Sequence, residues 1–251
     1  LALDAAAAAG RLVMRTFRTD PEVRHKSPDQ PVTEADLQAD ALLAGMLGGG
    51  RADYGWLSEE TVDRPERLSR HRVWVVDPID GTRSFIAGYP EFAVSVGLVE
   101  DGRALLGVIL NPARDETFWA VRGGGAFLRA GNGSPVRLSM EDPGADARPS
   151  LLASRSEIRR GELEAFAGGH DITGIGSTAY KMAGVAAGRG HAFLSRGPKS
   201  EWDVAAGVVI VEEAGGAVSH GSGRSVGGRW RRTDRRSARR RARRRRGRAG
   251  R

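Results

Sequence analysis

The sequence contains no cysteine among its 251 residues. This absence excludes a disulfide framework, a zinc–thiolate site and a cysteine nucleophile. The sequence also lacks any apolar run near the ~20 residues that a membrane-spanning helix needs. Residues 1–18 are alanine-rich and amphipathic, which is not the pattern of a signal peptide. We therefore expect no membrane association and a cytoplasmic location. Leu1 is not an initiator methionine, so we expect a processed or truncated start.

Histidine is also scarce, and its positions do not have the spacing of metal ligands. The five residues, which we interpret as surface or core residues, are His25, His71, His170, His191 and His220. The chain length is sufficient to bury a full hydrophobic core, and it fits one or two domains. The composition is therefore that of a globular protein without a histidine or cysteine metal site.

The positive charge is concentrated at the C-terminal end. Residues 224–251 contain 15 arginines, no lysine and one acid, Asp234, so their net charge is +14. The net charge of the whole chain is +8, which leaves −6 for residues 1–223. Such a segment cannot bury a core, and we expect a disordered or non-native tail. Its charge favours nonspecific binding of polyanions. A solvated native tail and a nucleic-acid-binding arm are the alternatives.

A short acidic motif stands at the end of a predicted strand. Residues 77–82 read Asp-Pro-Ile-Asp-Gly-Thr and follow the apolar run 73–76 directly. Carboxylates fixed at a strand end suit Mg²⁺, which prefers oxygen ligands in octahedral geometry and leaves positions for water or phosphate. The alternative is a proline-containing turn in which Asp77 and Asp80 bond their own backbone.

Two further acidic segments precede this motif. Glu59 and Glu60 follow residues 54–57, which are predicted to form a short strand. Thr33 and Asp36 have the spacing of a capping box and begin a predicted helix. Each segment alone has an ordinary explanation, because paired glutamates are typical of a solvated face and capping would account for the aspartate.

Two more segments lie in the second half of the chain. Asp203 lies near the start of a predicted helix that runs to Ala214 and is closed by Gly215-Gly216. An acid at that position is favourable against the helix dipole without any function. The segment 176–178, Gly-Ser-Thr, is a small polar turn before another apolar helical run. Taken singly, neither segment indicates a site.

In this order and at these separations, from about Lys26 to about Ser219, the segments resemble the inositol monophosphatase superfamily of Mg²⁺-dependent phosphate monoesterases. The resemblance includes the stretches 92–97 and 123–127. It implies an α/β (α+β) fold, a layered αβαβα sandwich of the sugar-phosphatase type, with a metal site in the cleft between two halves. It also implies two or three Mg²⁺ ions, inhibition by Li⁺, a small phosphorylated substrate and, as in many members, a homodimer.

The resemblance also implies the metal ligands. Glu59 and Asp77, with the backbone carbonyl of Ile79, would hold one ion, and Asp77, Asp80 and Asp203 would hold a second. Metals in such a site lower the pKa of a bound water and stabilise an in-line displacement at phosphorus. A side-chain nucleophile is then not required.

The resemblance implies three catalytic groups and a phosphate-binding turn. Glu60 would orient metal-bound water, and Thr82, hydrogen-bonded to Asp36, would align the attacking water. The backbone N–H groups of Gly81 and Thr82, at the start of a helix near residue 83, would bind the phosphate. Glycine suits this position because the backbone must approach the anion closely. The other implied substrate contacts are Gly176, Ser177 and Thr178.

The remaining pattern predicts two halves. Strand-like runs at 92–100 and 103–110 surround Asp101-Gly102, a strong hairpin signal. Residues 116–121 and 126–128 predict further strands, and residues 140–149 have the composition of a linker. We expect an N-terminal α+β half with most metal ligands, a C-terminal α/β half that closes the cleft, and the tail, with these bounds: 1–140, 150–223 and 224–251.

The substrate prediction depends on two cations. The inositol-hydrolysing subgroup has a glutamate seven residues before the helix aspartate, and here that position is Arg196. Arg196 and Lys199 can pair with a second phosphate, for which the arginine fork is well shaped. Residues 26–33 also resemble the mobile loop of the CysQ-like 3′(2′),5′-bisphosphate nucleotidase subgroup. We therefore expect removal of the 3′-phosphate of adenosine 3′,5′-bisphosphate.

Other functions stay open at this point. Both cations can be solvated and contact no substrate. The chain would then be an inositol-1-monophosphatase or an enzyme like fructose-1,6-bisphosphatase. A different class is an inactive phosphatase-like protein that binds nucleic acid through its arginine-rich tail. Against this class, no acidic motif position is lost, and Trp230 is the only aromatic residue of the tail that could stack on bases.

Overall fold

The computed structural model describes residues 1–220 except 29, 50, 52 and 141–147. Most of the predicted linker and all of the predicted tail, residues 224–251, therefore lie outside the described residues. Within the described ranges, no helix combines the length and the apolar character that crossing a membrane requires.

The helices begin and end close to the predicted positions. Thr33 and Asp36 form the predicted capping box at the start of α2, with the backbone N–H of Thr33 donating to Asp36 Oδ2 at 2.7 Å. Ser200 and Asp203 form a second capping box at the start of α7. The helices are α1 (Ala2–Met14), α2 (Glu34–Gly48), the 3₁₀ helix η1 (Pro65–Ser69), α3 (Thr82–Ile86), α4 (Arg155–Arg159), α5 (Glu164–Ala167), α6 (Thr178–Ala186) and α7 (Glu201–Glu213).

A seven-stranded sheet in the order β3-β4-β5-β6-β7-β8-β9 forms the centre of the molecule. Only β3 and β4 pair in parallel, and the other neighbours are antiparallel. The predicted hairpin at Asp101-Gly102 connects β5 to β6, and both residues have positive φ. The strands are β3 (Gly55–Ser58), β4 (Arg72–Asp80), β5 (Ala93–Glu100), β6 (Arg103–Asn111), β7 (Glu116–Val121), β8 (Gly125–Ala130) and β9 (Val136–Leu138).

Two smaller sheets complete the described fold. The hairpin of β1 (Val23–Ser27) and β2 (Gln30–Thr33) is antiparallel. The second half contributes a parallel sheet in the order β11-β10-β12, with β10 (Ser150–Ala153), β11 (Asp171–Gly174) and β12 (Ala192–Phe193). Helix α4 begins two residues after the last residue of β10, so it lies at the carboxyl end of that strand.

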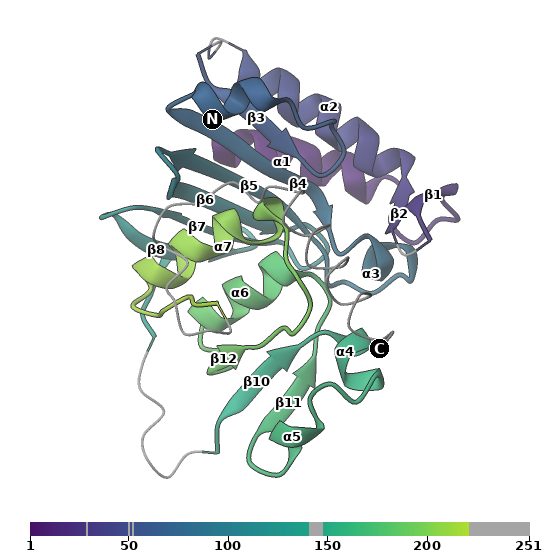
Figure 1. Cartoon of the computed structure of the whole chain (residues 1–251), viewed down its shortest axis with the longest axis vertical. Coiled ribbons are helices and arrows are strands. Elements are labelled where there is room, and N and C mark those ends of the chain that lie inside the picture. The colour runs from purple at the N-terminus through teal and green to yellow at the C-terminus, as the bar shows by residue number, and fades with distance from the viewer. Residues whose placement is uncertain (29, 50, 52, 141–147, 221–251) are drawn as a thin grey trace, which may run out of the picture.

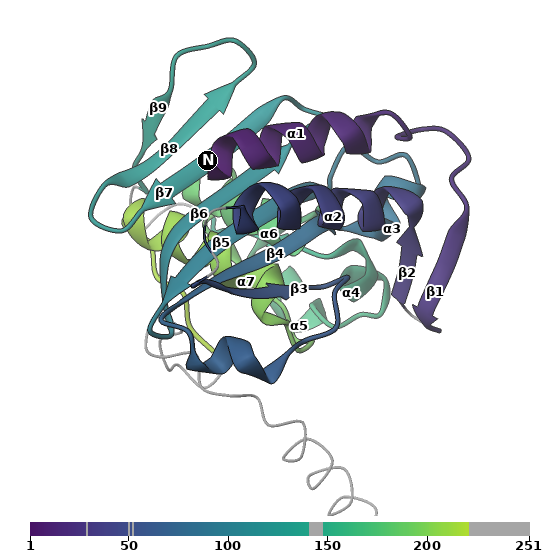
Figure 2. The ribbon, with the colours of Figure 1, turned by 90° about the horizontal axis from the view of Figure 1, so that it is seen from above.

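The elements stack in layers. Helices α1 and α2 pack on one face of the seven-stranded sheet, and α6 and α7 pack on its other face (Figures 1 and 2). The parallel sheet lies beyond α6, with α4 and α5 beside β10 and β11 (Figure 1). The predicted layered αβαβα fold is confirmed. The division into 1–140 and 150–223 stays a prediction, since α6 and α7 pack on the sheet of the first half.

Helix α7 lies in close contact with the central sheet. It is buried over Ala205–Val211, so it is apolar on nearly all sides and shows little amphipathic pattern. A Cβ atom at Gly107 of β6 would lie 2.8 Å from the Cα atom of Ala206. Glycine at this position therefore lets the helix backbone approach the strand, and this packing fixes where the first turn of α7 lies.

Candidate active site

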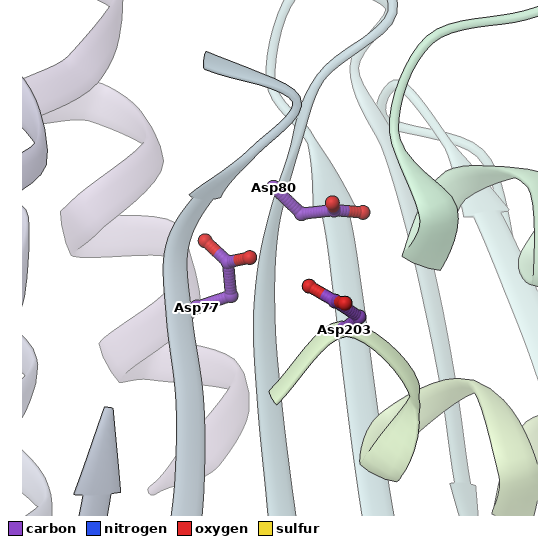
Figure 3. A group of neighbouring side chains, drawn as sticks. All are labelled: Asp77, Asp80 and Asp203. Carbon is purple, nitrogen blue, oxygen red and sulfur yellow. The ribbon is translucent and has the colours of Figure 1, made fainter. Parts of the chain in front are cut away.

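Three aspartates meet at the end of the central sheet. Oxygen atoms of Asp77, Asp80 and Asp203 all lie within 4.8 Å of one another (Figure 3). Asp77 and Asp80 come from the end of β4, and Asp203 comes from the first turn of α7. The structure therefore brings together three of the four predicted carboxylate ligands as one cluster.

An irregularity in β4 explains why Asp77 and Asp80 point the same way. Residues three apart in a regular strand face opposite sides. Here Asp77 pairs with Ser95 and Asp80 with Ala93, so three steps on β4 oppose two on β5, as in a β-bulge. After the bulge, Ile79 joins the core cluster on the α1 and α2 side, which leaves Asp80 facing α6 and α7.

Within the described residues, hydrogen-bond donors and cations do not balance the negative charge of this cluster. Asp77 is buried, and its Oδ1 accepts the backbone N–H of Ile79 at 3.1 Å, but its Oδ2 has no hydrogen-bond partner in the described part of the chain. Burial, followed by repulsion from Glu59, Asp80 and Asp203, raises the pKa of Asp77 well above its usual value. A buried carboxylate in this position needs a proton or a cation. These donors fit a hard divalent cation.

The pKa values of the other two aspartates, Asp80 and Asp203, are also raised. Burial and then the charge of Asp80 raise the pKa of Asp203 to about 7. Burial also raises the pKa of Asp80, although Ser177 and Lys181 act in the opposite direction. The side-chain hydroxyl of Ser177 donates to Asp80 Oδ2 at 2.5 Å. Oδ1 of Asp80 is thus the oxygen that remains for a cation.

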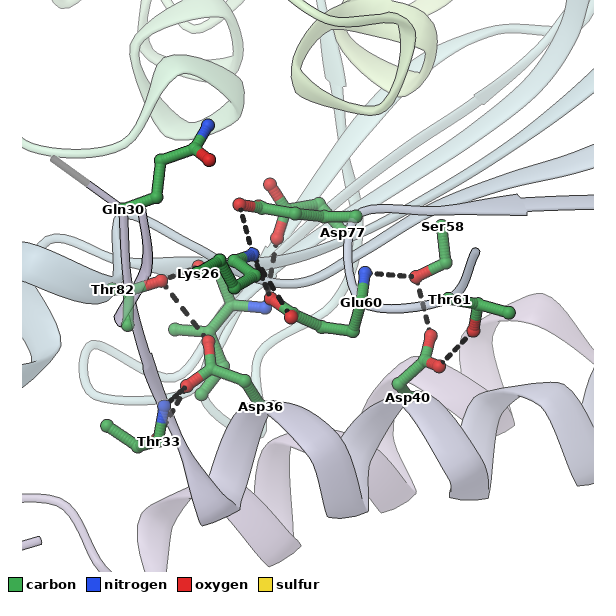
Figure 4. Close-up of polar contacts among 12 residues, drawn as sticks. Lys26, Gln30, Thr33, Asp36, Asp40, Ser58, Glu60, Thr61, Asp77 and Thr82 are labelled. Atoms are coloured by element: carbon green, nitrogen blue, oxygen red, sulfur yellow. Dashed lines mark hydrogen bonds and ion pairs between the residues drawn. The ribbon is translucent and has the colours of Figure 1, made fainter. Parts of the chain in front are cut away.

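Glu59 and Glu60 lie next to the cluster and share one lysine. Nζ of Lys26, from β1, donates to Glu59 Oε1 at 2.8 Å and to Glu60 Oε1 at 2.9 Å (Figure 4). Burial is the main cause that raises the pKa of Glu60 to about 7, and Lys26 offsets part of this effect. Glu59 lines the same cavity as the three aspartates, whereas Glu60 lies outside the cavity lining.

Asp40 of α2 holds the segment that carries these glutamates. Its carboxylate accepts the hydroxyl of Ser58 at Oδ1 and that of Thr61 at Oδ2, each at 2.5 Å (Figure 4). The sequence pattern did not single out Asp40, because its two partners lie 18 and 21 residues away. The feature that could have identified Asp40 is its position as an acid on the inner, apolar face of the predicted helix.

Asp36 and Thr82 are hydrogen-bonded, as the resemblance implied. The Thr82 hydroxyl lies 3.2 Å from Asp36 Oδ1 and 3.1 Å from the carbonyl oxygen of Ile79 (Figure 4). Thr33 donates to Asp36 Oδ2 through both its backbone N–H and its hydroxyl, at 2.7 and 2.6 Å. Burial is the main cause that raises the pKa of Asp36, and these donors partly offset it. The Thr82 oxygen is therefore fixed at the edge of the acidic cluster.

A cavity of about 470 Å³ opens onto this cluster. Gly81 has φ 96°, and a Cβ atom there would lie 3.1 Å from the backbone nitrogen of Ser177, so the two turns that face the cavity are in close contact. The volume suits a small ligand. The predicted site residues that line it are Glu59, Asp77, Asp80, Gly81, Thr82, Gly176, Ser177, Thr178, Lys199 and Asp203.

Arg196 is placed differently from the prediction. It is exposed, it lies outside the cavity lining, and its Nη1 contacts the carbonyl oxygen of Glu162 at 3.4 Å. The cause is local, because the backbone N–H of Arg196 donates to Glu157 Oε1 at 3.1 Å and so fixes the chain at this residue. Arg196 thus lies outside the cavity lining, whereas Lys199 lines it, and a substrate contact of either residue stays a prediction.

Several cavity residues were missed by the sequence analysis. Arg155 and Arg159 of α4 line the cavity, together with Tyr89. The feature that could have identified them is the position of α4 at the carboxyl end of a parallel strand, where ligands of α/β sheets usually bind. Lys181 of α6 also lines the cavity, and burial lowers its pKa to about 8. Its ammonium group donates to the carbonyl oxygen of Ser177 at 2.7 Å.

Comparison with known proteins agrees with this geometry. A sequence model of the inositol monophosphatase family matches residues 1–245. An inositol-1-monophosphatase of Mesorhizobium japonicum is 37% identical over 229 residues, which are 86% of this chain and 83% of that protein. A histidinol-phosphatase of Chlorobaculum parvum is 38% identical over 231 residues, 89% of this chain and 86% of that protein.

A solved structure shows the same fold. CysQ from Bacteroides thetaiotaomicron, described as a bacterial member of the inositol monophosphatase family, has a TM-score of 0.70 and 30% identity to this chain, with 85% of each chain covered. Because the family match spans nearly the whole sequence and these relatives align over most of their own lengths, this chain belongs to the inositol monophosphatase family.

Proposed function

We propose that this protein hydrolyses a small phosphate monoester in a Mg²⁺-dependent reaction. The observation that carries the proposal is the buried Oδ2 of Asp77, which lacks a partner in the described residues, on an aspartate that meets Asp80 and Asp203 at a cavity of ligand size. Such a carboxylate cluster is unfavourable unless a cation neutralises it. The family is one of phosphatases, which fits this requirement.

Five residues would hold the metal ions in this proposal, as side-chain ligands or through a backbone carbonyl: Glu59, Asp77, Ile79, Asp80 and Asp203. When bound, Mg²⁺ supplies charge neutralisation at the phosphate and a lower pKa for a bound water. Hydrogen bonds already orient two of these groups. Asp77 is oriented by the backbone N–H of Ile79, and Asp80 is oriented by the Ser177 hydroxyl.

The chain's own residues would align the attacking water and the phosphate. The Thr82 hydroxyl has a single hydrogen, so when it donates to Asp36 its oxygen lone pairs can accept from a water. Glu60 would orient a second water when its carboxylate is not hydrogen-bonded to Lys26. The backbone N–H groups of Gly81 and Thr82 and the turn 176–178 would bind the phosphate, and both segments line the cavity.

Family membership leaves the substrate open, because the relatives named above carry different activities at similar identity. We propose adenosine 3′,5′-bisphosphate, cleaved at its 3′-phosphate, ahead of inositol 1-phosphate. Support comes from the cationic side chains of Arg159 and Lys199 in the cavity lining, which suit a ligand with a second anionic group. The proposed cytoplasmic location and homodimer stay predictions.

Phosphate release from three substrates tests this function. The purified protein is assayed with adenosine 3′,5′-bisphosphate, inositol 1-phosphate and fructose 1,6-bisphosphate, in Mg²⁺ and in excess chelator, alongside Asp77→Asn. We expect hydrolysis that requires Mg²⁺ and is lost in the variant, with the highest kcat/KM for the nucleotide. Hydrolysis that persists in chelator would contradict the metal site. A preference for inositol 1-phosphate would contradict the substrate alone.

A further inference from the structure

The cavity is lined by two exposed cationic side chains that form no ion pair in the described part of the chain. They belong to Arg159 of α4 and to Lys199, which precedes α7, and the charge of Lys199 acts on Glu157 and Asp203. Arg155 is different, because it forms an ion pair with Glu91 and lies over the ring of Tyr89, with 4.7 Å from its Cζ to the ring centroid. Arg159 and Lys199 are therefore the two of these three cations that are not held in an ion pair, and an anion in the cavity can approach them.

One buried carboxylate connects the two segments that carry these cations. Glu157, two residues before Arg159, is only 3% exposed. Its Oε1 accepts the Ser195 hydroxyl at 2.7 Å and the backbone N–H of Arg196 at 3.1 Å. The segment that leads to Lys199 is thus anchored to α4 by hydrogen bonds to a charged acceptor, which are among the stronger ones in proteins.

The cavity lining contains both acidic and cationic side chains. The metal-binding residues are acidic, so they attract a cation and, through it, one phosphate. Arg159 and Lys199 would attract an anion directly, and the planar fork of arginine matches a phosphate group. Arg155 differs from them, because its guanidinium is held by Glu91. A ligand with two separated phosphates would meet both kinds of group.

We infer that Arg159 and Lys199 bind the second phosphate of the substrate, the one that is not hydrolysed, and that Glu157 is a positioning residue for Lys199. This inference rests on the proposed function and adds the residues that select a bisphosphate over a simple monoester. Arg196, which the sequence pattern favoured for this role, lies outside the cavity lining and has no part in it.

The kinetic test compares two substrates that differ by one phosphate. Adenosine 3′-monophosphate carries the same 3′-ester as adenosine 3′,5′-bisphosphate but lacks the 5′-phosphate. We expect Arg159→Ala and Lys199→Ala each to lower kcat/KM for the bisphosphate on the order of tenfold to a hundredfold, mainly through KM, and to change the monophosphate value little. Arg196→Ala is the matched control and should leave both values unchanged. Equal losses for both substrates, or no loss for either, would overturn the inference.

Binding separates this inference from the proposed function. Adenosine 5′-monophosphate contains only the phosphate assigned to Arg159 and Lys199, and its binding is measured by calorimetry in chelator, so that no metal site competes. We expect the Kd to rise about tenfold in Arg159→Ala and to stay constant in Arg196→Ala. If the protein hydrolyses no ester but this difference is found, the proposed function fails and the second phosphate site stands. A Kd that does not change in Arg159→Ala and Lys199→Ala overturns the site.

A pair of substitutions tests the positioning role. Gln at position 157 keeps an oxygen that can accept from Ser195 and Arg196, whereas Ala does not. We expect Glu157→Ala to raise KM for the bisphosphate while kcat for the monophosphate stays near the wild-type value, and Glu157→Gln to restore most of that KM. A loss in Glu157→Ala that is the same for both substrates would show a general structural role and overturn the assignment.

Discussion

The hydroxyl of Ser177 donates to Asp80 Oδ2 at 2.5 Å, across 97 residues of sequence. The backbone N–H of Ala179 donates to the same oxygen, also at 2.5 Å. The first turn of α6 therefore fixes the orientation of a carboxylate at the end of β4. Because α7 supplies Asp203 and α6 orients Asp80, the acidic cluster is complete only when both helices pack on the central sheet, which links the folding of the second half of the chain to the proposed metal site.

Replacing one of the clustered acids should separate activity from stability. We expect Asp80→Asn to lower kcat/KM in Mg²⁺ by more than about a hundredfold, since outer-shell partners of metals already cost 10–100-fold. The volume is unchanged, and the amide oxygen can still accept from Ser177. In chelator the variant should unfold at a temperature equal to or above that of the wild type, because a buried and repelled charge is gone.

The control for this experiment is Asp20→Asn, an exposed aspartate outside the cavity lining, which should leave both measurements unchanged. Wild-type turnover by Asp80→Asn would show that Asp80 is not a ligand.

The Thr82 hydroxyl offers a test of water alignment. Thr82→Val keeps the shape but removes the hydroxyl that lies 3.2 Å from Asp36. We expect kcat to fall about 10–100-fold with a smaller change in KM, as for other groups that orient a metal-bound ligand. Thr82→Ser retains the hydroxyl and should keep most of the activity. If Val and Ser variants have the same kcat, the hydroxyl does not align the water.

The pH dependence of stability should reverse between metal-free and metal-bound protein. Glu60 and Asp203 have pKa values of about 7 in the fold, against 4.5 and 3.8 when unperturbed. Between pH 5 and 7 the folded state therefore binds more protons than the unfolded state, so the free energy of unfolding falls as pH rises. Excess Mg²⁺ should remove or reverse this fall, because it binds the deprotonated carboxylates.

Thermal unfolding from pH 5 to 8, in chelator and in Mg²⁺, measures both effects. Glu91 and Glu116 have lowered pKa values, so the stability they contribute is lost only below this range. Asp203→Asn should flatten the slope in chelator. A melting temperature of the metal-free wild type that rises from pH 5 to 7 would contradict this account of the cluster.

Two glycine substitutions should change stability in opposite directions. A Cβ atom at Gly107 would lie 2.8 Å from the Cα atom of Ala206, which is backbone and cannot move aside easily. We expect Gly107→Ala to destabilise the fold by about 1–3 kcal/mol. Gly45 is exposed in α2 with nothing within 4 Å of a Cβ atom, so Gly45→Ala should stabilise by about 0.5–1 kcal/mol. Chemical denaturation measures both, and a neutral Gly107→Ala would show that α7 is not held at its closest approach.

Local patterns accounted for much of the fold. The capping-box spacing of Thr33 and Asp36 and the hairpin signal at Asp101-Gly102 each depend on neighbouring residues, and the structure has both. The strand 93–100 begins one residue later than predicted. These features could be predicted because the chemistry that causes them lies within a few residues of sequence.

Side-chain direction in the cavity could not be predicted in the same way. Arg196 was expected there because of its spacing from Asp203, but a hydrogen bond from its backbone to Glu157, 39 residues away, sets its position. Arg155 and Arg159 were missed because the capping-box spacing of Ser154 and Glu157 predicts the start of their helix and not what the helix faces. The contact of Lys26 with Glu59 spans 33 residues and is visible only in the folded chain. Long-range contacts decide which cations face the cavity.

The bulge in β4 leaves no backbone donor unsatisfied. Pro78 has no N–H to bury, and the N–H of the next residue, Ile79, is accepted by the carboxylate of Asp77. The same hydrogen bond leaves the other oxygen of Asp77 buried without a partner in the described residues. The six residues from Asp77 to Thr82 thus orient Asp77 by themselves, whereas Asp80 depends on α6 for its orientation. A strand from another protein that ends with this segment should therefore reproduce the bulge and the direction of the Asp77 carboxylate, and should need a second segment to hold the Asp80 carboxylate.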